Sequence, residues 1–178
     1  MPVYSVPLPE SSVLKALEGA NKVRIIGCGF CDNWSLAYNY NQPINEIKTE
    51  GDKTITVPYS LSLELNRWKK LLEEEGKSCE IEVTPQLCMY SEDPVILERS
   101  NLLKLSGKDF VERCKGSDAV LCFGCSAAFA GLMRRLGDDV MLIPGLKSVG
   151  ALQIQTYMDE SGRFIMMNNE GSTIIKNK

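Results

Sequence analysis

The chain has 178 residues, 44% of them hydrophobic and 24% charged, which is enough for one well-buried core, so we expect a single domain over residues 1–178. Its net charge is −3 and its 20 Lys and Arg residues form no basic stripe, which argues against a nucleic-acid-binding surface. No segment approaches the ~20 apolar residues that span a bilayer, and no signal-peptide pattern opens the chain, so we expect a cytoplasmic protein without a membrane partner.

An extended arm and a short helix are expected at the start of the chain. Three prolines within residues 1–9 predict the arm, and the apolar spacing that follows predicts a helix ending near Gly19. Residues 22–26 are rich in β-branched side chains and precede a glycine, which is typical of a buried strand. Residues 32–41 are expected to form a helix that ends before Pro43.

The strongest helical pattern lies in the middle of the chain, over residues 61–75. Its apolar residues recur at helical spacing, and Gly76 provides a stop. A brief extended segment is expected before it, at residues 54–58. Residues 79–84 follow it and alternate between polar and apolar side chains, so they predict a strand.

The rest of the chain continues to alternate helical and strand patterns. Weaker helical patterns occupy residues 92–105 and 107–115. A continuous apolar strand is expected at residues 119–123, followed by a helix rich in Ala, Leu and Met at residues 126–136. A further strand is expected at residues 140–143.

Strands separated by helices imply right-handed crossover connections. We therefore predict an α/β fold with a single doubly wound, mostly parallel sheet and flanking helices, in the manner of Rossmann-like proteins. Residues 151–178 are less regular, and a hairpin arm or edge strand is expected near residues 163–167.

The chain has seven cysteines and no histidine, which limits the catalytic mechanisms and metal sites that it can form. Without histidine, Ser-His-Asp and conventional Cys-His catalysis are excluded. A transition-metal site must be built mainly from thiolates, which suit zinc or an iron–sulfur cluster. An odd number of cysteines in a reducing compartment indicates metal ligands, redox groups or core residues before it indicates disulfides.

Four of the cysteines are expected to meet at one edge of the sheet. Ligands of an open α/β sheet gather outside the carboxyl ends of the strands, where neighbouring loops converge. Cys28 and Cys31 follow the first predicted strand. Cys88 comes after the second strand, and Cys125 comes after the third. The sequence therefore predicts a metal site at this edge.

The other three cysteines are expected outside the site. Cys79 begins a strand and Cys114 precedes one, so both belong at the opposite edge. Cys122 lies within an apolar strand and is expected to point into a helix-packed layer. Glycines beside Cys28 and Cys125 allow backbone N–H groups to turn toward the sulfur atoms and offset anionic charge.

One chelating Cys-x-x-Cys pair with two remote cysteines fits a [4Fe–4S] cluster and is less typical of structural zinc. A zinc-stabilised module for binding or assembly, without redox activity, is an alternative. A second alternative is a thiol oxidoreductase in which Cys28 is the nucleophile and Cys31 the resolving thiol.

Three segments, residues 23–31, 117–125 and 140–150, resemble a known family. They look like the cysteine-rich, iron–sulfur- and zinc-binding C-terminal domain or subunit of methylenetetrahydrofolate reductase. That family accompanies the flavin-bearing reductase subunit in acetogens and related anaerobes. The resemblance covers about residues 20–150 and is strongest at the two Gly-Cys turns.

The resemblance implies an electron-relay or accessory subunit of a reductase in one-carbon metabolism, paired with a flavoprotein subunit in a hetero-oligomer or present as a homo-oligomer. It places the cluster ligands on Cys28, Cys31 and Cys125, with Cys88 as the fourth. The family commonly has another cysteine and a Gly-Gly pair after the first Cys-x-x-Cys, where this chain has residues 32–37, and it commonly has a cysteine-rich carboxyl end.

Overall fold

The computed structural model describes residues 1–84, 87–89 and 110–176. Its helices are α1 (Glu10–Ala16), α2 (Cys31–Tyr40), α3 (Tyr59–Glu74), α6 (Phe110–Lys115) and α7 (Ser126–Leu136), with the 3-10 turn η1 (Leu87–Met89). Its strands are β1 (Val3–Pro7), β2 (Lys22–Cys28), β3 (Asn45–Glu50), β4 (Lys53–Pro58), β5 (Ser78–Thr84), β6 (Ala119–Phe123), β7 (Met141–Pro144), β8 (Leu146–Gln153), β9 (Thr156–Met158), β10 (Phe164–Met167) and β11 (Thr173–Lys176). Among these helices, none is both long and apolar enough to cross a membrane.

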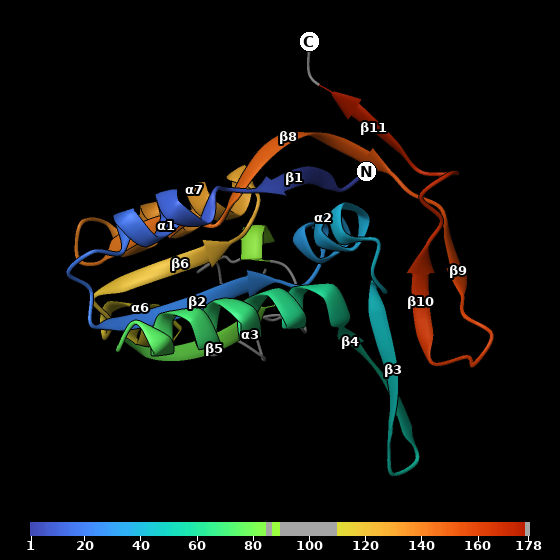
Figure 1. Ribbon diagram of the computed structural model, residues 1–178, viewed down its shortest axis with the longest axis horizontal. Helices are drawn as coiled ribbons and strands as arrows, with labels where there is room; N and C mark the ends of the chain where they lie inside the picture. The colour runs from blue at the N-terminus through green and yellow to red at the C-terminus, as the bar shows by residue number, and fades with distance from the viewer. Residues whose placement is uncertain (85–86, 90–109, 177–178) are drawn as a thin grey trace.

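Only part of the chain forms a parallel sheet, which has the strand order β5-β2-β6-β7. The prediction of a single doubly wound, mostly parallel sheet is therefore wrong. The other strands form two antiparallel sheets, with orders β1-β8-β11 and β4-β3-β10-β9 (Figure 1). Most residues of β3 and β4 are exposed or half-buried, so these strands lack the apolar runs from which the sequence analysis recognised strands.

The parallel sheet is covered on both faces, because successive residues of its strands point to opposite sides. Ile25 of β2 and Leu121 of β6 pack with α1 and α3, whose buried residues include Trp68. The next residue along each strand packs on the other side, where Ile26 and Cys122 contact α6, α7 and η1. The central strands of the sheet are thus buried between two helical layers. A functional site is therefore expected in the loops at the carboxyl edge of the sheet.

A third core lies beside the carboxyl edge of the parallel sheet. It contains Tyr4, Ala37, Ile44, Leu152 and Met167, which come from β1, α2, the segment before β3, β8 and β10. Helix α2 therefore packs against strands of both antiparallel sheets, whereas the β3–β4 hairpin projects from the body of the protein (Figure 1). This packing fixes the position of the first turn of α2, which contains the predicted ligand Cys31.

The ends of the chain are more regular than the sequence pattern indicates. The predicted arm at residues 1–9 contains β1, which pairs with β8, and residues 151–176 contribute to strands β8 to β11. The helix expected at residues 92–105 lies outside the described residues. Of the helix expected at residues 107–115, the described part forms α6.

Candidate functional site

The carboxyl edge of the parallel sheet carries the predicted ligands on three separate segments. Cys28 is the last residue of β2 and Cys31 is the first residue of α2. Cys88 lies in η1, and Cys125 is the residue directly before α7. Cys28 and Cys125 are buried, Cys31 is half-buried and Cys88 is exposed. The site therefore has a buried floor and one accessible thiol.

These four thiols are close enough to influence one another electrostatically. Burial is the main reason that the pKa of Cys28 is raised to about 12 and that of Cys31 to about 11. Cys88 adds a smaller contribution to both values, and Cys125 adds one to the pKa of Cys31. Although Cys88 is exposed as a residue, partial desolvation of its thiol is the first cause of its raised pKa, and Cys125 is the second. The structure thus brings the four predicted ligands together.

The thiols are not spaced to coordinate a single metal ion in this arrangement. Across residues 1–84, 87–89 and 110–176, no three Cys, Asp or Glu side chains are spaced so as to hold one metal ion. A bound ion would therefore require the side chains to close around it, and metal binding stays a prediction.

Backbone N–H groups point at two of the sulfur atoms. Cys28 accepts hydrogen bonds from the N–H groups of Phe30 and Leu87, and Cys31 accepts one from the N–H of Val3. These contacts lower the pKa values of both thiols, although burial outweighs them. Such N–H donors stabilise a thiolate when a cation is also present.

Two helices begin at the site. Helix α2 starts at Cys31, and helix α7 starts after Cys125, its N-cap residue. Neither N-cap residue forms a side-chain hydrogen bond to its helix. The partial positive charge of each helix N-terminus therefore acts on a cysteine and favours its anionic form.

A buried carboxylate, Asp32, lies in the same place, and sequence reasoning did not assign it to the site. Asp32 is the second residue of α2 and is fully buried. Its Oδ2 accepts a hydrogen bond from the backbone N–H of Cys125, with a donor–acceptor distance of 3.1 Å. Its Oδ1 has no hydrogen-bond partner in the described part of the chain. Burial raises the pKa of Asp32 to about 7.

Asp32 acts on more of the thiols than any single cysteine does. After burial, its charge is a further cause of the raised pKa values of Cys28, Cys31, Cys88 and Cys122. A signal for its burial exists in the sequence, because Asp32 shares a helix face with Ser35 and Leu36, three and four positions later. An acidic residue on the buried face of a helix is therefore expected to be buried as well.

Comparison with known proteins gives no match. No family model matches the chain, and neither a curated protein nor a solved structure matches it at a significant level. The resemblance of residues 20–150 to the cysteine-rich family of methylenetetrahydrofolate reductase, with the cofactor and partner that it implies, therefore stays a prediction.

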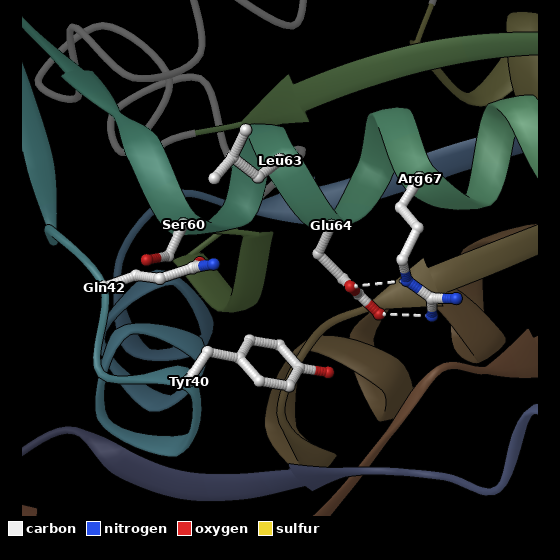
Figure 2. Close-up of a pocket in the computed structure, with 6 residues that line it drawn as sticks. All are labelled: Tyr40, Gln42, Ser60, Leu63, Glu64 and Arg67. Atoms are coloured by element: carbon white, nitrogen blue, oxygen red, sulfur yellow. Dashed lines mark hydrogen bonds and ion pairs between the residues drawn. The ribbon is translucent and has the colours of Figure 1, made fainter.

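A second candidate site is a pocket of about 270 Å³ between the end of α2 and the start of α3. Its lining residues are Tyr40, Gln42, Ser60, Leu63, Glu64 and Arg67 (Figure 2). The buried Glu64 accepts hydrogen bonds from Arg67 and from the indole N–H of Trp68, and Ser60 donates to the carbonyl of Pro43. The charged groups of this pocket already neutralise one another, and it contains no thiol.

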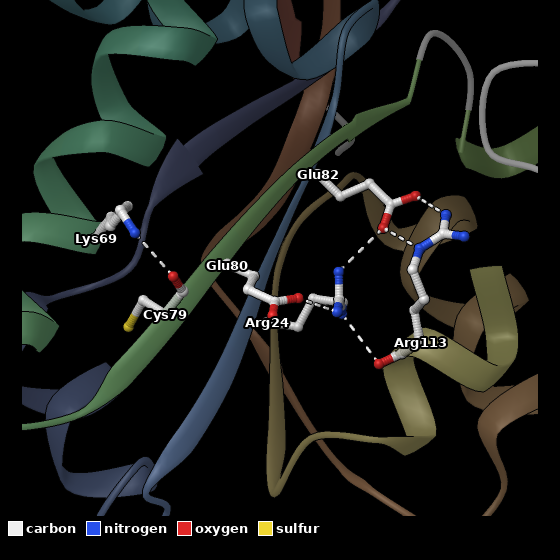
Figure 3. A network of polar contacts seen from close by, with 6 residues as sticks. All are labelled: Arg24, Lys69, Cys79, Glu80, Glu82 and Arg113. Atoms are coloured by element: carbon white, nitrogen blue, oxygen red, sulfur yellow. Dashed lines mark hydrogen bonds and ion pairs between the residues drawn. The ribbon is translucent and has the colours of Figure 1, made fainter. Parts of the chain in front are cut away.

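The cysteines that were predicted to lie elsewhere do so. Cys79 is at the start of β5, where its carbonyl accepts a hydrogen bond from Lys69 (Figure 3). Cys114 is buried in α6, beside an ion network that joins Arg24 of β2 to Glu80 and Glu82 of β5.

Arg113 of α6 completes this network by pairing with Glu82, as Figure 3 shows. Arg24 also donates to the carbonyl of Arg113, at 3.0 Å. The buried Arg24 thus has several partners, which is the condition under which buried charge is tolerated. These contacts connect β2, β5 and α6, so the role of the network is structural.

Cys122 is buried in β6 as expected, but it lies directly below the site. Burial is the main cause of its raised pKa, and Asp32, Cys28 and Cys125 contribute to it. Its sulfur also lies 2.9 Å from the position that a Cβ at Gly124 would occupy. Any larger residue at that turn would press on the floor of the site.

The donor set at the carboxyl edge fits a thiophilic metal better than it fits an activated nucleophile. A thiol oxidoreductase needs a cysteine whose pKa is lowered, whereas burial raises the pKa of Cys28 to about 12. A bound cation reverses this effect, because it removes the thiol protons and stabilises the thiolates.

Proposed function

We propose that Cys28, Cys31 and Cys125, with Cys88 as the fourth ligand, bind a [4Fe–4S] cluster. The observation that carries the proposal is the convergence of four thiols from three segments on one edge of the parallel sheet. Support also comes from the N–H groups directed at sulfur and from the two helix N-termini. Four cysteines are the usual ligand set of such a cluster.

The role proposed for the protein is electron transfer as an accessory subunit. A bound cluster would supply one-electron redox chemistry, and the protein would set its potential through the burial of Cys28 and Cys125 and through N–H donors to sulfur. Phe30 is partly exposed beside the site and packs against Trp34 in a tilted arrangement, with 4.5 Å between ring centroids. The accessible Cys88 and this aromatic pair give the site a side that can approach a redox partner.

The partner that we propose is the flavoprotein subunit of a reductase, of the kind that functions with methylenetetrahydrofolate. This part of the proposal rests on the sequence resemblance of residues 20–150. We also propose that the protein acts in the cytoplasm, because all seven cysteines are free, as suits a reducing compartment. The sequence resemblance further implies that the organism is an anaerobe.

The proposal is tested by purifying the protein under anaerobic conditions and measuring iron, acid-labile sulfide and zinc. We expect ~4 iron atoms per chain and a brown colour that dithionite bleaches. Zinc without iron would contradict the cluster and favour the zinc-stabilised module. A metal-free protein that reduces disulfides would favour the oxidoreductase.

Cysteine variants test which thiols bind the cluster. Replacing Cys28 or Cys125 by Ser should abolish cluster binding, because each removes a buried ligand. The matched control is Cys79→Ser, which changes a buried cysteine at the opposite edge and should leave the iron content unchanged. Equal loss of iron in the site variants and the control would contradict the assignment.

A further inference from the structure

The pocket between the end of α2 and the start of α3 has no part in the proposed function. Its volume is about 270 Å³. Figure 2 shows the ring of Tyr40 facing α3, with Gln42 on one side and the pair of Glu64 and Arg67 on the other. Tyr40 and Leu63, which line the pocket, are 42% and 43% exposed. The pocket therefore offers an aromatic ring and an aliphatic side chain to a ligand from solution.

The turn that ends α2 places two of the lining residues. Helix α2 ends at Tyr40, and the next residue, Asn41, has a left-handed backbone conformation with φ of 51°. Such a residue is a common way to end a helix. The Oδ1 of Asn41 accepts a hydrogen bond from Nδ2 of Asn169 at 3.1 Å. This turn brings the residues on both sides of Asn41, Tyr40 and Gln42, to the same pocket.

Two polar groups of the pocket are available to a ligand. They are the amide of Gln42 and the hydroxyl of Tyr40, and neither has a side-chain hydrogen bond to any residue that the structure describes. A side-chain amide presents an acceptor and a donor side by side. The amide of Gln42 can therefore form a pair of hydrogen bonds with a ligand that has a donor beside an acceptor.

The charged groups of the pocket already have partners. Arg67 donates to Glu64 through Nε at 3.0 Å and Nη2 at 2.9 Å, and to Glu10 through Nη1 at 2.6 Å. Glu64 also accepts the indole N–H of Trp68 at 2.9 Å. Burial first and Glu64 second raise the pKa of Tyr40, so its phenol stays neutral. These contacts favour an uncharged ligand.

An uncharged, flat ligand with a donor beside an acceptor describes a nucleobase. Bases stack on aromatic side chains, and the amide of Gln or Asn pairs with the amino group and a ring nitrogen of adenine. Arginine is the residue that most often recognises guanine, but Arg67 is held by two carboxylates here.

We propose that this pocket binds the adenine base of a nucleoside, with the ring against Tyr40 and the amino group and a neighbouring ring nitrogen bonded to the amide of Gln42. A volume of about 270 Å³ is small for a ligand site, so it suits the base, and the sugar would remain in solvent. The pocket contains no cysteine, so this binding is independent of the proposed cluster.

The test is calorimetric titration of the full chain with adenosine, which should show saturable binding. Tyr40→Ala should weaken the binding roughly tenfold, because it removes the stacking surface. Tyr40→Phe keeps the ring and should bind adenosine nearly as wild type does. The control Tyr157→Ala removes another exposed tyrosine, in β9 and outside the pocket, and should leave the affinity unchanged.

A second ligand tests the hydrogen bonds of Gln42. Purine riboside lacks the amino group of adenosine, so wild-type protein should bind it roughly tenfold more weakly than adenosine. Gln42→Leu has no amide, and it should bind adenosine more weakly and show no preference between the two ligands. A preference that survives in Gln42→Leu would contradict the assigned contact. The comparison of the two ligands on wild-type protein needs no variant to fold.

The phosphorylated nucleoside distinguishes a free nucleoside from a nucleotide as the source of the base. AMP should bind no more tightly than adenosine, because Glu10 and Glu64 already hold Arg67. Tighter binding of AMP would contradict an uncharged ligand. Absence of saturable binding at millimolar adenosine, or equal binding by wild type and Tyr40→Ala, would overturn the proposal. The iron content tests the cluster separately, so either proposal can fail alone.

Discussion

The carboxylate of Asp32 holds the N–H of Cys125 across 93 positions of the chain, with Oδ2 of Asp32 and the backbone nitrogen of Cys125 3.1 Å apart. This bond joins the first turn of α2 to the residue that caps α7. It therefore ties together two helices whose first turns carry predicted metal ligands. The position of each ligand depends on the fold of both halves of the chain.

The residue after Asp32 provides the first prediction. Asn33 is fully buried, donates to the carbonyl of Ile44 at 2.7 Å and accepts the N–H of Leu61 at 2.9 Å. Asn33→Ala leaves both backbone groups without these bonds, so it should lower the free energy of unfolding by roughly 2–4 kcal/mol. Chemical denaturation measures this change. The exposed Asn66, which bonds only within α3, provides a control, and Asn66→Ala should change stability by less than ~0.5 kcal/mol.

The second prediction concerns the close approach of β8 and β11. A Cβ added at Gly150 would collide with the backbone carbonyl oxygen of Ile175. Because a backbone atom cannot rotate away, Gly150→Ala should destabilise the protein by roughly 1–3 kcal/mol. Gly131, inside α7, has room for a Cβ, whose nearest neighbour would be Arg135 Nη1 at 3.7 Å. Gly131→Ala should be neutral or stabilising by up to ~1 kcal/mol, and a loss of stability equal to that of Gly150→Ala would contradict the argument.

The third prediction concerns the reactivity of the thiols in the metal-free protein. Cys88 is exposed, whereas Cys28 is buried and its pKa is raised to about 12 by burial. Near pH 8, an alkylating reagent should therefore modify Cys88 first and Cys28 only as the protein unfolds. Mass spectrometry of digested protein gives the order of modification.

A metal bound at the site should protect Cys88 as well, since a thiolate ligand reacts slowly. The denatured protein, in which all seven cysteines should react, is the control. Modification of Cys28 as fast as that of Cys88 in the folded, metal-free protein would show that the floor of the site is open.

The sequence was a good guide to the parallel sheet and to the position of the cysteines. The strand predicted at residues 119–123 is β6 and the helix predicted at residues 126–136 is α7, because both have clear apolar periodicity. The end of each apolar strand located Cys28 and Cys125 at the carboxyl edge. A continuous or periodic run of apolar residues is a local property of the sequence, so the elements that it forms can be predicted from local sequence.

The antiparallel sheets were not predictable in the same way. Val3 of β1 pairs with Ala151 of β8, so the partner that defines this strand is almost the whole chain away. Strand register is set by such partners and not by composition alone. Asp32 was missed for a related reason, since a charged side chain is ordinarily exposed and its burial here depends on tertiary packing.

The pairing of β1 with β8 also sets an order of events during synthesis. The N–H of Val3 reaches the sulfur of Cys31, and β1 is held in place by residues 146–151. A nascent chain that ends before β8 has no strand to anchor β1, so one of the N–H donors to the site is missing. All the cysteines leave the ribosome before the structure that shelters them is complete. If the proposed centre is bound there, its loading would therefore follow the synthesis of β8.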